Sequence, residues 1–178
     1  MMVGQKQAFD TKKAVAIVLY LAIRTPRPSF MSIAKLMYFA DKTHLERCGR
    51  MISTDCYVAM QHGPVPSHTY NLMRDTQPYS PYGFRVVDSY LIEAIVPPDL
   101  RLLAGQEVEC LNEIIARFGD APTWYLRQLS HDSAWQHAWQ QAQERGKGSH
   151  PISEEAILDM IFAEQDWPDF IHEFRESL

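Results

Sequence analysis

The chain has 178 residues, 46% hydrophobic and 22% charged, the proportions of an ordinary globular protein. Its net charge of -5, from 17 Lys and Arg against 22 Asp and Glu, argues against nucleic acid as the main partner, because such binding needs a basic surface. Three cysteines without tight pairing do not form a disulfide framework. No apolar run reaches the ~18 residues that a membrane span needs, so we expect a cytoplasmic protein with no membrane partner.

Most of the chain shows the apolar spacing of helices, with capping residues, prolines and glycines at the ends. Residues 1–9 form a polar leader that we expect to fray. Helices are predicted from Asp10 or Thr11 to about Arg24, from Ser29 or Ser32 to about Cys48, from Pro66 past Met73, from Leu103 or Gly105 to Phe118, from Pro122 or Thr123 to Ser130, from Ser133 to Arg145, and from Ser153 onward. Residues 152–178 are predicted as a C-terminal helical segment, interrupted at Pro168, whose far end carries an apolar face.

The middle of the chain is richer in β-forming residues. Tyr57–Met60 is predicted as a strand and residues 84–96 as a hairpin that turns at Asp88-Ser89, and residues 146–151 are predicted as a loop. Residues 62–67, with two prolines and Gly63, are predicted as a rigid corner. The sequence thus predicts a mostly α fold: one multi-helix domain over residues 10–178, with a small antiparallel sheet inserted in the middle of the chain.

No set of residues has the spacing of a known catalytic or metal site. His44, Cys48, Cys56, His62 and His68 are zinc-ligand types, but none of them forms the closely spaced cysteine pair of structural zinc sites. A cysteine nucleophile paired with His131 and Asp132 is not favoured either: Cys110 lies on an apolar stripe, and Asp132 is better placed as a helix N-cap. We therefore predict no catalytic, cofactor-binding or metal-binding residues. Trp135 and Trp139, four residues apart, are either core residues or anchors for a partner.

Three stretches together resemble a known family: Lys35-Leu-Met-Tyr-Phe-Ala-Asp-Lys-Thr-His-Leu45, Tyr57-Val-Ala-Met-Gln-His-Gly-Pro-Val-Pro-Ser67 and Leu129-Ser-His-Asp-Ser-Ala-Trp135. In this order they are similar to the SocA-like Panacea domain, a family of antitoxins also described among phage-associated proteins. The resemblance covers about residues 14–145. It carries over these motif positions, in a structural or partner-binding role: Lys35, Tyr38, Asp41, His62, Gly63, Pro64, Ser67, His131 and Trp135.

The resemblance implies a mostly helical domain that belongs to a toxin–antitoxin pair. Such a protein binds and neutralises a toxin, encoded by an adjacent gene, either by sequestering it or by presenting it to a cellular protease. The resemblance implies neither enzymatic activity nor a cofactor. Two alternatives stay open: a transcriptional or nucleic-acid-binding regulator, and a zinc- or cysteine-dependent enzyme.

The motif residues also allow predictions from their chemistry alone. Lys35 and Asp41 lie in a largely apolar helix, so they either face solvent or have polar partners, since an unpaired buried charge is costly. His62 either bonds a carboxylate such as Asp41 or is exposed. In the C-terminal segment, Trp167, Phe170, Ile171 and Phe174 recur at near-helical spacing and are expected to pack on the domain or on a partner.

Overall fold

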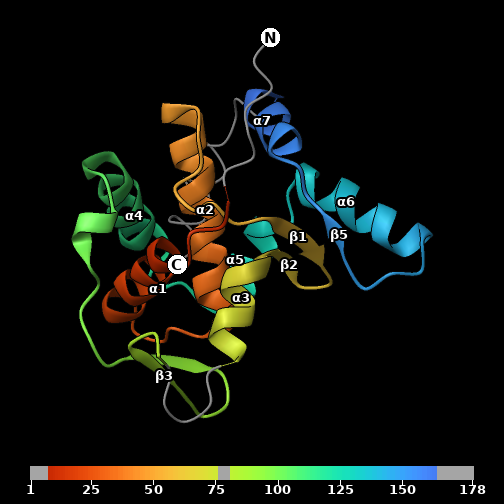
Figure 1. The fold of residues 1–178 in the computed structure, drawn as a ribbon. Helices are drawn as coiled ribbons and strands as arrows, with labels where there is room; N and C mark the ends of the chain where they lie inside the picture. Colours follow the sequence, from red (N-terminus) through yellow and green to blue (C-terminus); the bar gives the residue numbers. More distant parts are fainter. Residues whose placement is uncertain (1–7, 76–80, 164–178) are drawn as a thin grey trace.

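The computed structural model describes residues 8–75 and 81–163. These residues form a mostly α-helical fold, as predicted, with short antiparallel strands (Figure 1). In chain order the elements are α1 (Thr11–Arg24), α2 (Phe30–Cys48), β1 (Tyr57–Met60), β2 (Gly63–Pro66), α3 (Ser67–Arg74), β3 (Phe84–Val87), β4 (Leu91–Ala94), the 3-10 turn η1 (Leu100–Leu102), α4 (Gly105–Phe118), α5 (Thr123–Ser130), α6 (Ser133–Glu144), β5 (His150–Pro151) and α7 (Glu154–Ala163). The predicted helix limits agree with these within a few residues, except that the predicted interruption of the last helix at Pro168 lies outside the described residues.

Helix α2 forms the centre of the fold, with α1, α4, α5 and α7 packed around it (Figure 1). It begins at Ser29, whose side chain accepts the Ser32 N–H while Ser32 bonds back to the Ser29 N–H. It ends at Gly49, which has a left-handed φ of 69°. Thirteen of its 19 residues are buried, so its polar side chains are enclosed on almost every side and need partners inside the protein.

The predicted single sheet is wrong: the strands form two separate sheets. One has the order β2-β1-β5, all antiparallel, and the other is the hairpin β3-β4. The predicted corner at residues 62–67 is mostly strand β2, because it folds back on β1 through a two-residue turn at Gln61 and His62. Pro64 and Pro66 are tolerated because β2 is an edge strand, which needs no N–H donors toward a further strand.

The third strand of that sheet also departs from the prediction. His150 and Pro151, expected in a loop, pair with β1, and the Ile152 N–H bonds to the Tyr57 carbonyl. This pairing joins residues almost a hundred positions apart, so local composition does not reveal it. It brings α6 alongside β1 and β5, and these elements lie together on the right of the helical body in Figure 1.

The β3–β4 hairpin forms where it was predicted, although β4 ends at Ala94 rather than at residue 96. Asp88 and Ser89 both have positive φ, 51° and 67°, as the tight turn of a hairpin requires, although neither is glycine. The hairpin is tied to the start of α2, where the Phe30 N–H bonds to the Tyr90 carbonyl.

One hydrophobic cluster runs through the described part of the chain and includes residues from α1 through α7. None of the helices described is both long and apolar enough to cross a bilayer. Ser153 accepts the Ala156 N–H and caps α7, as predicted. The predicted leader up to residue 7, and the C-terminal prediction that involves Trp167 and residues 169–178, lie outside the described residues.

Candidate functional site

The three motif stretches, far apart in sequence, meet at one place in the fold. Helix α2 contributes Lys35 and Tyr38, the β1–β2 hairpin contributes the segment around Gly63, and the α5–α6 junction contributes His131 and Trp135. We call this group the motif cluster. It lies where α2 and α5 meet the sheet that carries α6.

Lys35 is the most enclosed charged side chain of the motif cluster, with no exposed surface. Its Nζ donates to the Pro64 carbonyl oxygen at 2.7 Å, which ties α2 to β2. Burial lowers the pKa of Lys35 to about 7; Arg127 lowers it further, whereas Asp132 raises it. Lys35 therefore pairs with a backbone group inside the protein, one of the two alternatives that the sequence left open.

Asp132 joins α2 to the start of α6. Its Oδ2 accepts hydrogen bonds from the Tyr38 hydroxyl at 2.9 Å and from the Lys42 ammonium at 3.0 Å. Its Oδ1 accepts the Trp135 N–H and caps α6, as predicted from the sequence. All these side chains are buried, and Lys42 also contacts the Met160 sulfur on α7. One carboxylate thus fixes the start of α6 against α2, and the lysine that it binds also contacts α7.

Trp135 and His131 form a stacked pair beside the β1–β2 hairpin. Their ring centroids are 3.7 Å apart and their planes differ by 6°. Trp135 is buried and its indole N–H donates to the Met60 carbonyl, so it acts as a core residue that holds the hairpin. Trp139 continues the stack at 6.2 Å. Burial lowers the pKa of His131 to about 4, with Arg127 acting in the same direction, so the imidazole is neutral at pH 7.

Gly63 allows β2 to approach the other parts of the motif cluster. Its φ is +102°, a conformation that other residues rarely adopt. A Cβ at this position would lie 2.6 Å from the Ser130 hydroxyl oxygen and 2.7 Å from Lys35 Nζ. His62, next to it, is exposed and bonds no carboxylate among the described residues, so the alternative of an exposed His62 is the one observed.

Asp41 lies on the same helix but has its own set of partners. Oδ1 accepts the Ile52 and Ser53 N–H groups, and Oδ2 accepts the Ser53 and Tyr57 hydroxyls. Burial raises the pKa of Asp41 to about 6, although these four donors favour the charged form. The Tyr57 ring packs edge-on against Tyr38 at 5.1 Å, which connects Asp41 to the motif cluster.

Ser67 is not part of the motif cluster. It is the first residue of α3, and its N–H bonds to the Cys56 carbonyl. The helix cap comes instead from Asp55, whose carboxylate accepts the His68 and Thr69 N–H groups. The motif position at Ser67 therefore belongs to the local structure that starts α3.

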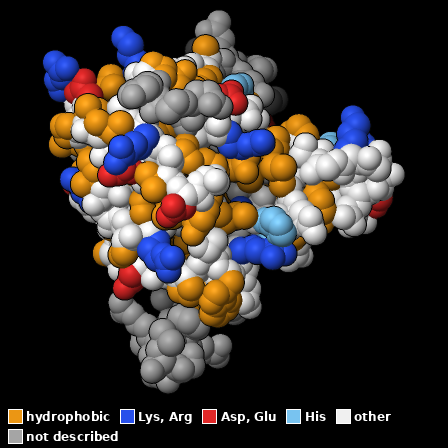
Figure 2. Space-filling model, turned by 90° about the horizontal axis from the view of Figure 1, so that it is seen from below, with side chains coloured by type: hydrophobic (Ala, Val, Ile, Leu, Met, Phe, Trp, Pro, Cys, Tyr) orange, Lys and Arg blue, Asp and Glu red, His pale blue; other side chains and the backbone are white. Residues whose placement is uncertain are grey.

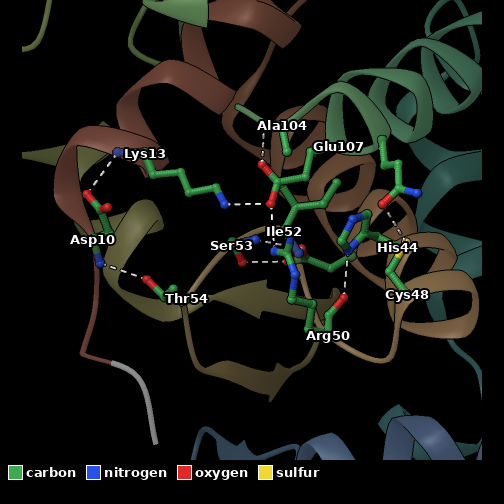
Figure 3. A network of polar contacts seen from close by, with 12 residues as sticks. Asp10, Lys13, His44, Cys48, Arg50, Ile52, Ser53, Thr54, Ala104 and Glu107 are labelled. Carbon is green, nitrogen blue, oxygen red and sulfur yellow. Dashed lines mark hydrogen bonds and ion pairs between the residues drawn. The ribbon is translucent and has the colours of Figure 1, made fainter. Parts of the chain in front are cut away.

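A further polar network holds α1, α4 and the segment after α2 together (Figure 3). The buried Glu107 accepts hydrogen bonds from Lys13, from Arg50 and from the Ala104 N–H. Burial acts to raise the pKa of Glu107, but these three donors hold it below its ordinary value. His44 lies beside this network, with Nδ1 2.7 Å from the Arg50 carbonyl (Figure 3). The network positions the loop whose N–H groups bind Asp41.

The residue types considered for zinc and for cysteine chemistry are dispersed in the structure. Within residues 8–75 and 81–163, no three His, Cys, Asp or Glu side chains lie close enough to hold a metal ion. Cys110 is buried in the core, and burial raises the pKa of its thiol. A buried thiol with a raised pKa is a poor nucleophile.

Reasoning from the sequence missed several members of the motif cluster. Lys42 has a detectable signal, since Lys35, Tyr38 and Lys42 are spaced i, i+3 and i+7 and so share one helix face. Asp132 was predicted only as the N-cap of α6. Its second role, as the acceptor for Tyr38 and Lys42, depends on residues that lie 94 and 90 positions earlier in the chain. Ser130 is an unremarkable residue in the sequence, and no pattern there indicates that it faces Gly63.

Comparison with known proteins gives one match. The family model described as antitoxin SocA-like, Panacea domain, matches residues 33–136. No curated protein and no solved structure matches the chain. The matched range begins in α2 and ends at the start of α6, so it contains all three motif stretches and with them the whole motif cluster.

Proposed function

Because the chain belongs to the family of SocA-like antitoxins with a Panacea domain, we propose that it is the antitoxin of a toxin–antitoxin pair and acts by binding a toxin protein. The observation that carries the proposal is the family match over residues 33–136. The partner is the product of an adjacent gene, and the complex forms in the cytoplasm.

The chemistry of the motif cluster is consistent with a role in binding. Lys35, Tyr38 and Asp132 are buried and bond groups of the same chain, so they fix the relative positions of α2, β2 and α6. A rigid scaffold of this kind lowers the entropic cost of association, because the binding surface is already ordered. Neutralisation of a toxin requires such a surface and no reacting group, and the proposed activity is therefore not enzymatic.

Two routes lead from binding to neutralisation. In the first, the antitoxin covers the toxin and holds it in an inactive complex. In the second, it presents the bound toxin to a cellular protease. The routes predict different lifetimes for the toxin: sequestration leaves the amount of toxin unchanged or raised, whereas presentation lowers it after synthesis has stopped.

Co-expression with the adjacent gene tests the proposal. The neighbouring product is expressed from one inducible promoter and this protein, with an affinity tag, from another. The proposal predicts that the neighbour alone arrests growth, that this protein restores growth, and that the two co-purify. A neighbour that is harmless alone and does not co-purify contradicts it. Following the toxin by immunoblot after synthesis is blocked separates the two routes.

A further inference from the structure

Helix α5 exposes a face whose composition is typical of a binding surface. Trp124, Arg127 and Gln128 are spaced i, i+3 and i+4, so they lie on one side of the helix, and all three are exposed. Trp124 keeps 61% of its surface exposed, although its ring also contacts Tyr125 edge-on at 5.8 Å. Tryptophan and arginine are the residues most enriched among those that dominate binding energy in protein interfaces.

The exposed cation of this face is Arg127, in a chain of net charge -5. Arg127 is near enough to Lys35 and His131 to lower the pKa of both, and His62 acts on His131 in the same way. Asp132 is the one acidic group among the described residues that acts on Lys35, and it is already bonded to a lysine. Lys35 and Lys42 are buried beneath this face, whereas Arg127 and His62 are both exposed.

The view from below shows basic and histidine side chains gathered where the helical body joins the projecting part of the molecule (Figure 2). Hydrophobic side chains are interspersed among them, and the projecting part is covered mainly by uncharged polar groups (Figure 2). The segment that leads into α5, residues 119–123, lines a cavity of about 610 Å³ together with Arg27, Tyr70 and Tyr90. Exposed Trp124 directly follows this cavity-lining segment and lies three residues before Arg127 on the same helix face.

We infer that the exposed face of α5 docks an acidic, partly apolar surface of the toxin. This inference rests on the proposed function and names the contact surface on this chain. The Trp124 ring fills an apolar depression of the partner, and the Arg127 guanidinium binds a carboxylate, for which its planar fork of N–H donors is well suited. The buried groups of the motif cluster hold α5 in place beneath this contact: the Ser130 hydroxyl bonds to the Arg127 carbonyl and faces Gly63.

The structure offers variants that test the surface without disturbing the fold. The Arg127 side chain forms no hydrogen bond or ion pair with another described residue, so Arg127→Glu reverses an exposed charge without breaking such a contact; it also replaces repulsion by attraction toward the buried Lys35. Trp124→Ala removes an exposed ring. Lys12→Glu is the matched control, because Lys12 is also exposed and without a described ion pair, but lies on α1. The melting temperature of each variant shows whether it folds, and Arg127→Gln replaces Arg127→Glu if the latter does not.

The experiment measures the affinity of each purified variant for the purified product of the adjacent gene, by calorimetry at low and at high salt. We expect Trp124→Ala to weaken binding by about 30-fold at either salt concentration, the effect of losing a dominant interface residue. We expect Arg127→Glu to weaken binding by about 10-fold or more at low salt and by less at high salt, because screening reduces repulsion between charges. Lys12→Glu should bind like the wild type.

The outcomes separate this inference from the proposed function. If the wild type does not bind the neighbouring product, the proposed function fails and the inference fails with it. If wild type, Trp124→Ala and Arg127→Glu all bind equally, only the α5 surface is wrong. Binding that disappears on nuclease treatment would assign the patch to nucleic acid and overturn the inference. Substitutions of Asp or Glu by Lys in the toxin that restore binding to Arg127→Glu, but not to Trp124→Ala, would support it.

Discussion

Replacing Gly63 by alanine should destabilise the protein more than the same change at any exposed glycine turn. The new Cβ would occupy space 2.6 Å from the Ser130 hydroxyl and 2.7 Å from Lys35 Nζ, on a backbone with φ of +102°. Both neighbouring side chains are buried, so neither can move aside into solvent. The alanine must therefore displace Lys35 from the Pro64 carbonyl or shift β2 itself.

The size of the effect is the sum of two costs. A residue with a Cβ at positive φ costs about 1–2 kcal/mol. Separating Lys35 from Pro64 leaves the buried Lys35 Nζ without its acceptor, which costs about 1–3 kcal/mol. We expect Gly63→Ala to lower the free energy of unfolding by about 2–5 kcal/mol.

Gly49→Ala is the matched control, because it isolates the first cost. Gly49 also has positive φ, +69°, but no atom lies within 4 Å of the position of its Cβ. Urea unfolding followed by circular dichroism should show a loss of about 1–2 kcal/mol for this variant. If Gly63→Ala loses no more than Gly49→Ala, the close contact among Gly63, Ser130 and Lys35 is not what the fold requires of this glycine.

Three other changes probe the buried polar groups. Asp41→Asn should lower the free energy of unfolding by about 2–4 kcal/mol in urea, because an amide cannot accept all four donors; an unchanged midpoint would mean that the carboxylate is not needed. The pKa of Lys35 falls from 10.5 to about 7 on folding, so above pH 7 the unfolded chain binds more protons than the folded one. The stability of wild type relative to Lys35→Met should therefore rise from pH 7 to pH 9. A constant difference would show that Lys35 stays charged in the fold. The pKa of His131 falls from 6.5 to about 4 on folding, so the unfolded chain binds more protons as the pH falls from 6.5 to 4, and the protein should lose stability over that range. His131→Phe keeps a ring stacked on Trp135 but cannot be protonated, so it should remove this loss. Wild type must be compared with His131→Phe at each pH, because the raised pKa of Asp41 increases stability as the pH falls over the same range. If the stability of the two proteins changes equally with pH, His131 does not have the lowered pKa.

The helices were predictable because their ends are encoded locally. Asp10, Ser29 and Asp132 each accept an N–H of the first turn of the helix that they cap, and Gly49 provides the left-handed C-terminal residue of α2. These interactions span three or four residues, so a single sequence reveals them. The same is true of the hairpin turn, although it uses Asp88 and Ser89 in place of glycine.

The arrangement of the strands and the partners in the motif cluster were not predictable in this way. Strand β5 exists only because β1 lies beside it, and a two-residue strand has no periodicity of its own. Lys35 and Tyr38 could be identified as motif positions, but Lys35 bonds a backbone carbonyl and Tyr38 a carboxylate 94 residues away. The local reasoning that linked His62 to Asp41 could not foresee that the loop after α2 satisfies Asp41 first.

The most direct test of the antitoxin function is a titration of the two purified proteins. The product of the adjacent gene is titrated with the wild-type chain by calorimetry, and the mixture is then analysed by size-exclusion chromatography with light scattering. We predict a saturable exchange of heat and a single complex that contains both chains. Two separately eluting proteins with no measurable heat, for a neighbour that arrests growth when it is expressed alone, would contradict the proposal that this chain neutralises it by binding.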